Sequence, residues 1–226
     1  MISFKKNTLS NIVQMVFCFG TALGLILVIF SRILLPRTSF LSIASTCLML
    51  VVYGLVGHFV FPRIHPEKRR IILLVGLLAG IIFAGEILLE YALLPKDNTS
   101  WGFIEFGSVF ALYFLSGLWV AYQYKSIKDG ILTAIMTALL SSLVWLIFLL
   151  ITFYLFRGTL RQELVFAAEG NFEDFARSGM NDFNTFVMED FLGAGFFHML
   201  LAPFFAAILG TIGSALGKGI AQLRKH

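Results

Sequence analysis

Residues 71–94 read IILLVGLLAGIIFAGEILLEYALL, a stretch in which only two residues, both glutamates, are charged. The hydrocarbon core of a bilayer is about 30 Å thick, and a helix needs about 20 apolar residues to cross it. Arg69 and Arg70 directly precede the stretch and would lie in the headgroup region. The segment is therefore predicted to be a transmembrane helix.

Five further stretches of the chain pass the same test, and they are separated by segments rich in proline, glycine and charge, which end helices. The six predicted spans are residues 12–35, 40–61, 71–94, 103–124, 131–156 and 191–217. The composition agrees, with 58% hydrophobic and 13% charged residues, whereas soluble domains carry about 25% charged residues. We expect an all-α polytopic transmembrane bundle that forms one integral membrane domain over residues 1–226.

The distribution of lysine and arginine predicts the orientation of the bundle, because cytoplasmic loops carry the excess of these residues. The side that holds both termini has eleven: Lys5, Lys6, Arg63, Lys68, Arg69, Arg70, Lys125, Lys128, Lys218, Arg224 and Lys225. The opposite side has six: Arg32, Arg37, Lys96, Arg157, Arg161 and Arg177. Both termini are thus expected in the cytoplasm of a multi-pass protein, and a bacterial plasma membrane is the expected location.

The long segment at residues 157–190 is acidic and carries phenylalanines at helical spacing. This pattern predicts one or two short amphipathic helices on the outer side. Helices that bind anionic lipid usually carry basic residues, so packing on the protein's own outer mouth is favoured over lipid contact. Docking to a partner protein is a third possibility.

Five ionisable residues are expected at similar depth in the outer half of the membrane. Glu86 and Glu90 are four residues apart and share one face of a helix. At 1.5 Å per residue they lie roughly 12 and 6 Å below the outer boundary, and His198 lies roughly 10 Å below it. Glu105 and Arg32 sit near the outer ends of their own spans. Charged groups inside a membrane raise a functional hypothesis by default.

This predicted cluster has two interpretations. It could bind a proton, a cation or a cationic substrate, because neighbouring carboxylates in a low dielectric cannot both stay ionised without compensation. Alternatively, Arg32 and His198 could join the glutamates in a structural knot that holds the helices in register. Pro203 adds to the picture, because it frees the carbonyl of Met199 beside His198.

Glycines at four-residue spacing predict close approach of helices. They are Gly20, Gly24, Gly76, Gly80, Gly210, Gly213 and Gly217. These positions favour a tightly packed bundle, and one of the glycine stripes could serve a partner subunit or a second copy of the chain.

The sequence holds no recognised catalytic, nucleotide-binding or metal-binding motif. We therefore expect no enzyme activity, cofactor or metal, and the net charge of +4 does not call for a nucleic acid. The lipid bilayer is the first expected partner, and two hypotheses follow for the function. The first is a non-catalytic subunit or scaffold that packs with partner membrane proteins. The second is a small transporter or substrate-binding component that uses the Glu/His cluster.

Overall fold

The computed structural model describes the backbone of residues 3–93 and 99–224, and the side chains of residues 14–93 and 100–224. All regular structure in these ranges is helical, which confirms the predicted fold class. The elements are α1 (Ser3–Leu34), α2 (Phe40–Phe59), the 3₁₀ turn η1 (Phe61–Arg63), α3 (Pro66–Leu93), α4 (Thr99–Tyr124), α5 (Ile127–Phe156), α6 (Leu160–Ala168), α7 (Asn171–Ser178) and α8 (Phe183–Leu223).

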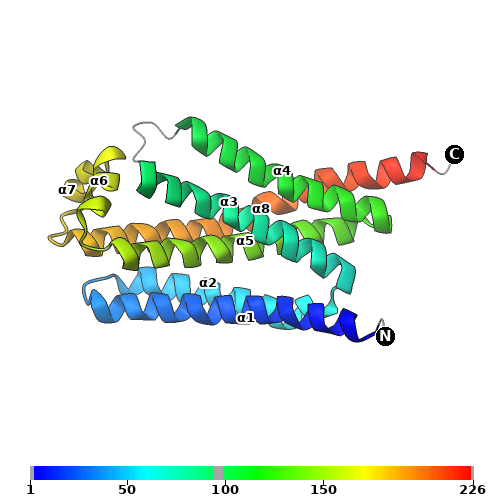
Figure 1. Ribbon diagram of the computed structural model, residues 1–226, viewed down its shortest axis with the longest axis horizontal. Helices are drawn as coiled ribbons and strands as arrows, with labels where there is room; N and C mark the ends of the chain where they lie inside the picture. The colour runs from blue at the N-terminus through cyan, green and yellow to red at the C-terminus, as the bar shows by residue number, and fades with distance from the viewer. Residues whose placement is uncertain (1–2, 94–98, 225–226) are drawn as a thin grey trace.

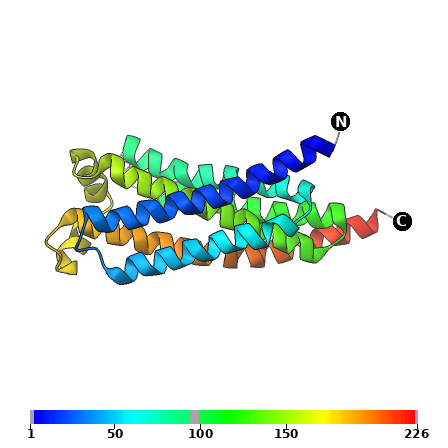
Figure 2. The same ribbon diagram turned by 90° about the horizontal axis from the view of Figure 1, so that it is seen from below.

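Six of the described helices, α1 to α5 and α8, are long and apolar enough to cross a membrane. They lie side by side along the long axis of the molecule (Figure 1). The start of α1 and the end of α8 lie together at one end, which we call the termini end (Figures 1 and 2). The short helices α6 and α7 lie at the opposite end, which we call the loop end. The chain is thus an integral multi-pass membrane protein.

Helix α5 is the centre of the bundle. In the most apolar stretch of α5, 67% is buried inside the protein, against 28% to 39% for the corresponding stretches of the other five spans. Small hydroxyl side chains let neighbouring helices approach it, and Thr137, Ser141 and Ser142 each donate a hydrogen bond to a backbone carbonyl of α5 itself. Because these polar groups are satisfied within the helix, they can be buried at low cost.

Helix α8 continues through Pro203, and the structure shows how the lost hydrogen bond is replaced. Proline has no N–H, so the carbonyl of Met199 four residues earlier lacks its helical donor. The hydroxyl of Tyr53 in α2 donates to that carbonyl at 2.6 Å, and both residues are buried. The freed carbonyl that the sequence placed near His198 is therefore used to join α2 to α8.

In the termini half of the bundle, α4 and α8 pack backbone against backbone. A Cβ added at Gly213 or Gly217 would collide with main-chain atoms of α4. Gly117 faces the same contact from α4, where an added Cβ would lie 2.9 Å from the carbonyl oxygen of Gly210. Such separations are possible only without side chains, so these glycines fix α4 on α8.

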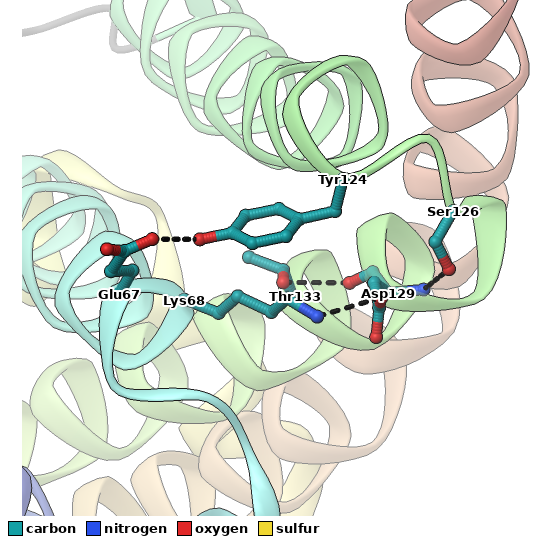
Figure 3. Close-up of polar contacts among 6 residues, drawn as sticks. All are labelled: Glu67, Lys68, Tyr124, Ser126, Asp129 and Thr133. Carbon is teal, nitrogen blue, oxygen red and sulfur yellow. Dashed lines mark hydrogen bonds and ion pairs between the residues drawn. The ribbon is translucent and has the colours of Figure 1, made fainter.

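A polar cluster fastens α4 to α3 and α5 at the termini end (Figure 3). Lys68 of α3 pairs with Asp129 of α5 at 2.8 Å and lies over the ring of Tyr124 at 4.5 Å. The hydroxyl of Tyr124, the last residue of α4, donates to the carboxylate of Glu67 at 2.5 Å. Ser126 accepts from the backbone N–H of Asp129 and caps α5. Three helices are thereby held together at one end.

Toward the loop end, α4 moves away from α5 and α8 and stays beside α3 (Figure 1). The first turns of α4 expose their large apolar side chains: Phe103 is 77% exposed and Ile104 is 61% exposed. In a membrane protein these side chains face lipid. Helix α4 is therefore anchored at the termini end and stands off from the bundle at the loop end.

Two helices start well before the predicted spans: α1 at Ser3 and not at residue 12, and α8 at Phe183 and not at residue 191. The predicted outer segment 157–190 thus contributes its last eight residues to α8. Asp182 caps this helix by accepting from the backbone N–H of Thr185 at 3.1 Å. The carboxylate of Glu189 accepts hydrogen bonds from Ser39 and Ser42, which makes its place in the helix tolerable.

The remainder of that segment forms α6 and α7, which confirms the prediction of short helices. Phe172 of α7 stacks on Phe183 of α8 with ring centres 4.9 Å apart, so α7 packs on the protein's own loop end. Among the lysines used to predict orientation, Lys5, Lys6, Lys96 and Lys225 lie outside the described side chains.

Candidate binding cleft

A cleft of about 320 Å³ lies between the loop-end halves of α3 and α4, and we call it the acidic cleft. Most of its wall is aliphatic or aromatic, but three carboxylates interrupt it. The lining residues are Ile82, Gly85, Glu86, Leu89, Glu90, Leu93, Trp101, Ile104, Glu105 and Ser108. Small-molecule sites usually measure about 300–1,000 Å³ and combine apolar walls with a few polar groups, so the acidic cleft has the character of a binding site.

Helical periodicity explains why these residues meet. Glu86 and Glu90 are one turn apart on α3, and Trp101, Glu105 and Ser108 follow one face of α4. The two faces meet where Glu86 lies against Gly102 and Glu105. The cleft is the space left open beside this contact.

Glu105 is the most unusual residue of the acidic cleft. Its side chain is only 7% exposed, and apart from the carboxyl of Glu86 no hydrogen-bond partner in the described part of the chain reaches either carboxylate oxygen. More than nine in ten buried polar groups in proteins find a partner. An orphaned carboxylate that borders a cavity therefore points to a group that the cavity would hold.

Glu86 faces Glu105 from the other wall of the acidic cleft. Its carboxylate oxygen Oε1 lies beside Gly102 of α4, 3.8 Å from the position that a Cβ would take there. Glu86 is close enough to Glu105 for the two carboxyls to share a proton. In the described ranges no group of three or more His, Cys, Asp or Glu side chains is arranged to hold a metal ion.

Helix α6 is docked on the end of α3 at the mouth of the acidic cleft. The guanidinium of Arg161 donates hydrogen bonds to the backbone carbonyls of Tyr91 and Ala92 in the last turn of α3. Those carbonyls have no helical donor, and a cation there also complements the helix dipole. Arg161 thus fixes the loop segment beside Glu90.

Glu169, at the end of α6, brings a further carboxyl to this mouth. Burial raises its pKa to about 7, and the nearby charges of Asp190 and Glu86 act in the same direction. The amide of Asn171 donates to it at 2.7 Å and partly offsets the rise. Because the folded pKa lies above the ordinary value of 4.5, the contribution of Glu169 to stability decreases as the pH rises between these two values.

His198 lies in a separate aromatic environment. Its ring stacks on Trp145 with centres 4.3 Å apart and meets the edge of Phe83 at 4.7 Å. The Nε2 atom is buried and has no hydrogen-bond partner among the described residues. His198 shares the expected depth with the glutamates but is not bonded to them.

Arg32 also stands apart from the acidic cleft. Its guanidinium donates a hydrogen bond to the backbone carbonyl of Thr38, in the turn between α1 and α2. The knot that would join Arg32 and His198 to the glutamates is therefore not formed among the described residues. Of the five ionisable residues singled out in the sequence, the structure brings together Glu86, Glu90 and Glu105.

The glycines predicted to pack helices lie in contacts within this chain. An added Cβ would meet another residue of the chain within 2.5–3.0 Å at five positions: Gly20 against Leu143, Gly24 against Leu50, Gly76 against Leu140, Gly80 against Val144 and Gly210 against Ala134. Gly213 and Gly217 contact α4, as described above. These glycines therefore serve the packing of the single chain.

Sequence reasoning did not single out Trp101, Ser108, Arg161 or Glu169 for this site. Trp101 reads as an interfacial residue and Arg161 as one charge among several in an acidic loop. The position of Glu105 four residues after Trp101 was the one signal that places both on the same face. Comparison of the chain with protein-family models, with curated proteins and with solved structures gave no match.

Proposed function

We propose that this protein is a membrane-embedded binding component for an organic cation, in which Glu105 carries the negative charge that the ligand neutralises. The proposal develops the transport or substrate-binding hypothesis drawn from the sequence. The observation that supports it is the buried carboxylate of Glu105, which borders the acidic cleft and, in the described ranges, meets no basic side chain and no hydrogen-bond partner other than the carboxyl of Glu86.

The energetic reason is the cost of burying an anion. Moving a carboxylate out of water costs several kcal/mol even after the protein relaxes, unless a cation or hydrogen bonds compensate for it. Arg32 and His198, the two basic residues expected nearby, are engaged elsewhere. The compensating charge must then come from a proton or from a molecule in the acidic cleft.

The apolar wall favours an organic cation over a metal ion. Hard metal ions such as Ca²⁺ and Mg²⁺ bind in cages of six or more oxygen ligands, whereas Leu89, Leu93 and Ile104 form much of this wall. An ammonium or phosphonium ligand with apolar substituents would satisfy the carboxylate and bury its own hydrocarbon at the same time. The cleft volume of about 320 Å³ is within the range of small-molecule sites.

Entry of the ligand from the membrane follows from the position of α4. Trp101 and Ile104 line the acidic cleft and are also more than half exposed on the membrane-facing surface. With both termini in the cytoplasm of a bacterial plasma membrane, as the charge distribution predicts, the acidic cleft would open to the outer leaflet. Release on the opposite side would make the protein a transporter.

Binding of radiolabelled tetraphenylphosphonium tests the proposal. The purified protein in nanodiscs of zwitterionic lipid is expected to bind this probe saturably, above the partitioning measured in empty nanodiscs. Glu105→Gln should abolish the saturable component, because it removes the charge and keeps the shape. Glu163→Gln is the matched control, since Glu163 is an exposed carboxylate of α6 outside the acidic cleft.

Saturable binding that Glu105→Gln leaves unchanged would refute the proposal, as would the absence of any saturable binding by the wild-type protein. A control variant as defective as Glu105→Gln would show that surface charge attracts the probe, and it would equally count against the proposed site.

The subunit or scaffold hypothesis needs an exposed surface, and α7 offers one. Helix α7 has no buried residue, and Arg177 and Asp174 form an exposed ion pair on it. Stoichiometric co-purification of a second membrane protein in mild detergent, lost on Arg177→Asp, would favour this alternative.

A further inference from the structure

A second cavity lies beside a neighbouring face of α4, between α4 and α8, and measures about 290 Å³. We call it the aromatic pocket, because rings form most of its wall: Phe83, Phe106, Phe110, Trp145, His198 and Phe205. We infer that the aromatic pocket holds an aromatic ring of the same ligand whose positive charge lies at Glu105. This inference rests on the proposed function and specifies the class of ligand.

The aromatic pocket and the acidic cleft are adjacent. Phe106 lines the pocket and the preceding residue, Glu105, lines the cleft. On α3, Phe83 lines the pocket and the preceding residue, Ile82, lines the cleft. The rings of Phe83 and Phe106 meet edge to face with centres 5.5 Å apart, so this aromatic pair forms the boundary between the two cavities beneath α4.

The wall of the aromatic pocket suits a ring that belongs to a cation. Aromatic rings attract one another in stacked and edge-to-face arrangements, and their negative faces attract positive charge. The indole of Trp145 already stacks on the imidazole of His198 with an angle of 24° between the planes. A ring that enters from the boundary at Phe106 would continue this packing while its charged centre stays near Glu105.

His198 adds a polar feature that an entirely apolar ligand would not use. Its Nε2 atom is buried without a hydrogen-bond partner in the described part of the chain, and the ring lines the aromatic pocket. A buried polar atom without a partner is costly. The favoured ligand is therefore a hydrophobic cation with an aromatic ring, and a polar substituent on that ring would find a partner in His198.

Two cations of the same charge separate the aromatic contribution from the charge contribution. Binding of tetraphenylphosphonium, which has aromatic substituents, is compared in nanodiscs with binding of tetrabutylammonium, which has aliphatic ones. Ala194→Phe fills the edge of the aromatic pocket from an exposed position of α8. Ala111→Phe adds the same volume at an exposed position of α4 outside both cavities and is the control.

Ala194→Phe is expected to weaken tetraphenylphosphonium binding about tenfold, in keeping with the loss of stacking and cation–π contacts, and to leave tetrabutylammonium binding within about twofold. Phe205→Leu removes one ring from the wall without adding volume and should act in the same direction. This second variant decides the question if Ala194→Phe does not fold. Glu105→Gln should abolish the binding of both cations.

The outcomes distinguish this inference from the proposed function. If both cations bind through Glu105 and neither pocket variant changes their ratio of affinities, the aromatic pocket is excluded and the proposed function stands. An equal loss for both cations would also overturn the inference, because it shows distortion of the acidic cleft. If neither cation binds the wild-type protein, the proposed function fails and the inference fails with it.

Discussion

Replacing Glu105 by leucine is expected to stabilise the empty protein while it destroys the proposed binding site. Leucine has a comparable volume and no polar atoms, so it would remove both orphaned oxygens from the buried position. Active sites often carry groups that cost stability because they serve a ligand. A gain in stability on removal of Glu105 would identify it as such a group.

The size of the stabilisation expected for Glu105→Leu follows from the two carboxylate oxygens that the substitution removes. Each buried polar atom without a partner costs about 1–3 kcal/mol. Proton sharing with Glu86 and relaxation of α4 reduce this sum, so we expect a gain of about 2 kcal/mol in the free energy of unfolding. For a chain of this length each kcal/mol shifts the melting temperature by about 2–4 °C, which gives a rise of roughly 4–8 °C.

Thermal unfolding in detergent, followed by intrinsic tryptophan fluorescence without added ligand, measures this shift. Glu163→Leu, at an exposed position of α6, should stay within about 0.5 kcal/mol of the wild type. A melting temperature of Glu105→Leu equal to or below that of the wild type would refute the reasoning, because it would mean that the carboxylate is already satisfied in the folded protein.

Three further outcomes are expected. Gly213→Ala should lower the free energy of unfolding by about 1–3 kcal/mol, because the new methyl group collides with the α4 backbone, whereas Gly219→Ala, which enters open space, should not. Tyr53→Phe should cost about 1–3 kcal/mol by leaving the Met199 carbonyl unsatisfied, and an unchanged melting temperature would contradict that role. Glu169→Gln should reduce the decline in stability, read from melting temperatures, as the pH rises from 4.5 to about 7.

The sequence was sufficient for those features of the fold that depend on length and hydrophobicity alone. Each span reveals itself as a run of about 20 apolar residues, and depth in the membrane follows from counting residues along a helix. Glu86, Glu90 and Glu105, which this counting predicts at similar depth, line one cleft in the structure. The start of α8 was harder, because acidic residues such as Glu189 are tolerated in a span only where a partner like Ser42 bonds them.

Depth does not reveal the direction in which a residue points around the bundle. His198, predicted at the depth of the glutamates, faces an aromatic pocket, and Arg32, predicted near the same depth, bonds to a turn. Which helices become neighbours depends on packing between distant segments, which a single sequence does not display. For the same reason Gly76 could be assigned to close packing but not to its contact with Leu140 of α5.

Because α4 is anchored at only one end, the acidic cleft would be exposed to the ligand concentration in the membrane and not to the concentration in water. An opening between two helices inside a leaflet samples molecules dissolved in hydrocarbon, and a hydrophobic cation accumulates there far above its level in water. Apparent affinity would then rise with the oil–water partition coefficient of the ligand, even among cations that contact Glu105 identically. A weak intrinsic contact could suffice in the cell, and the surrounding lipid would act as the reservoir that keeps the site filled.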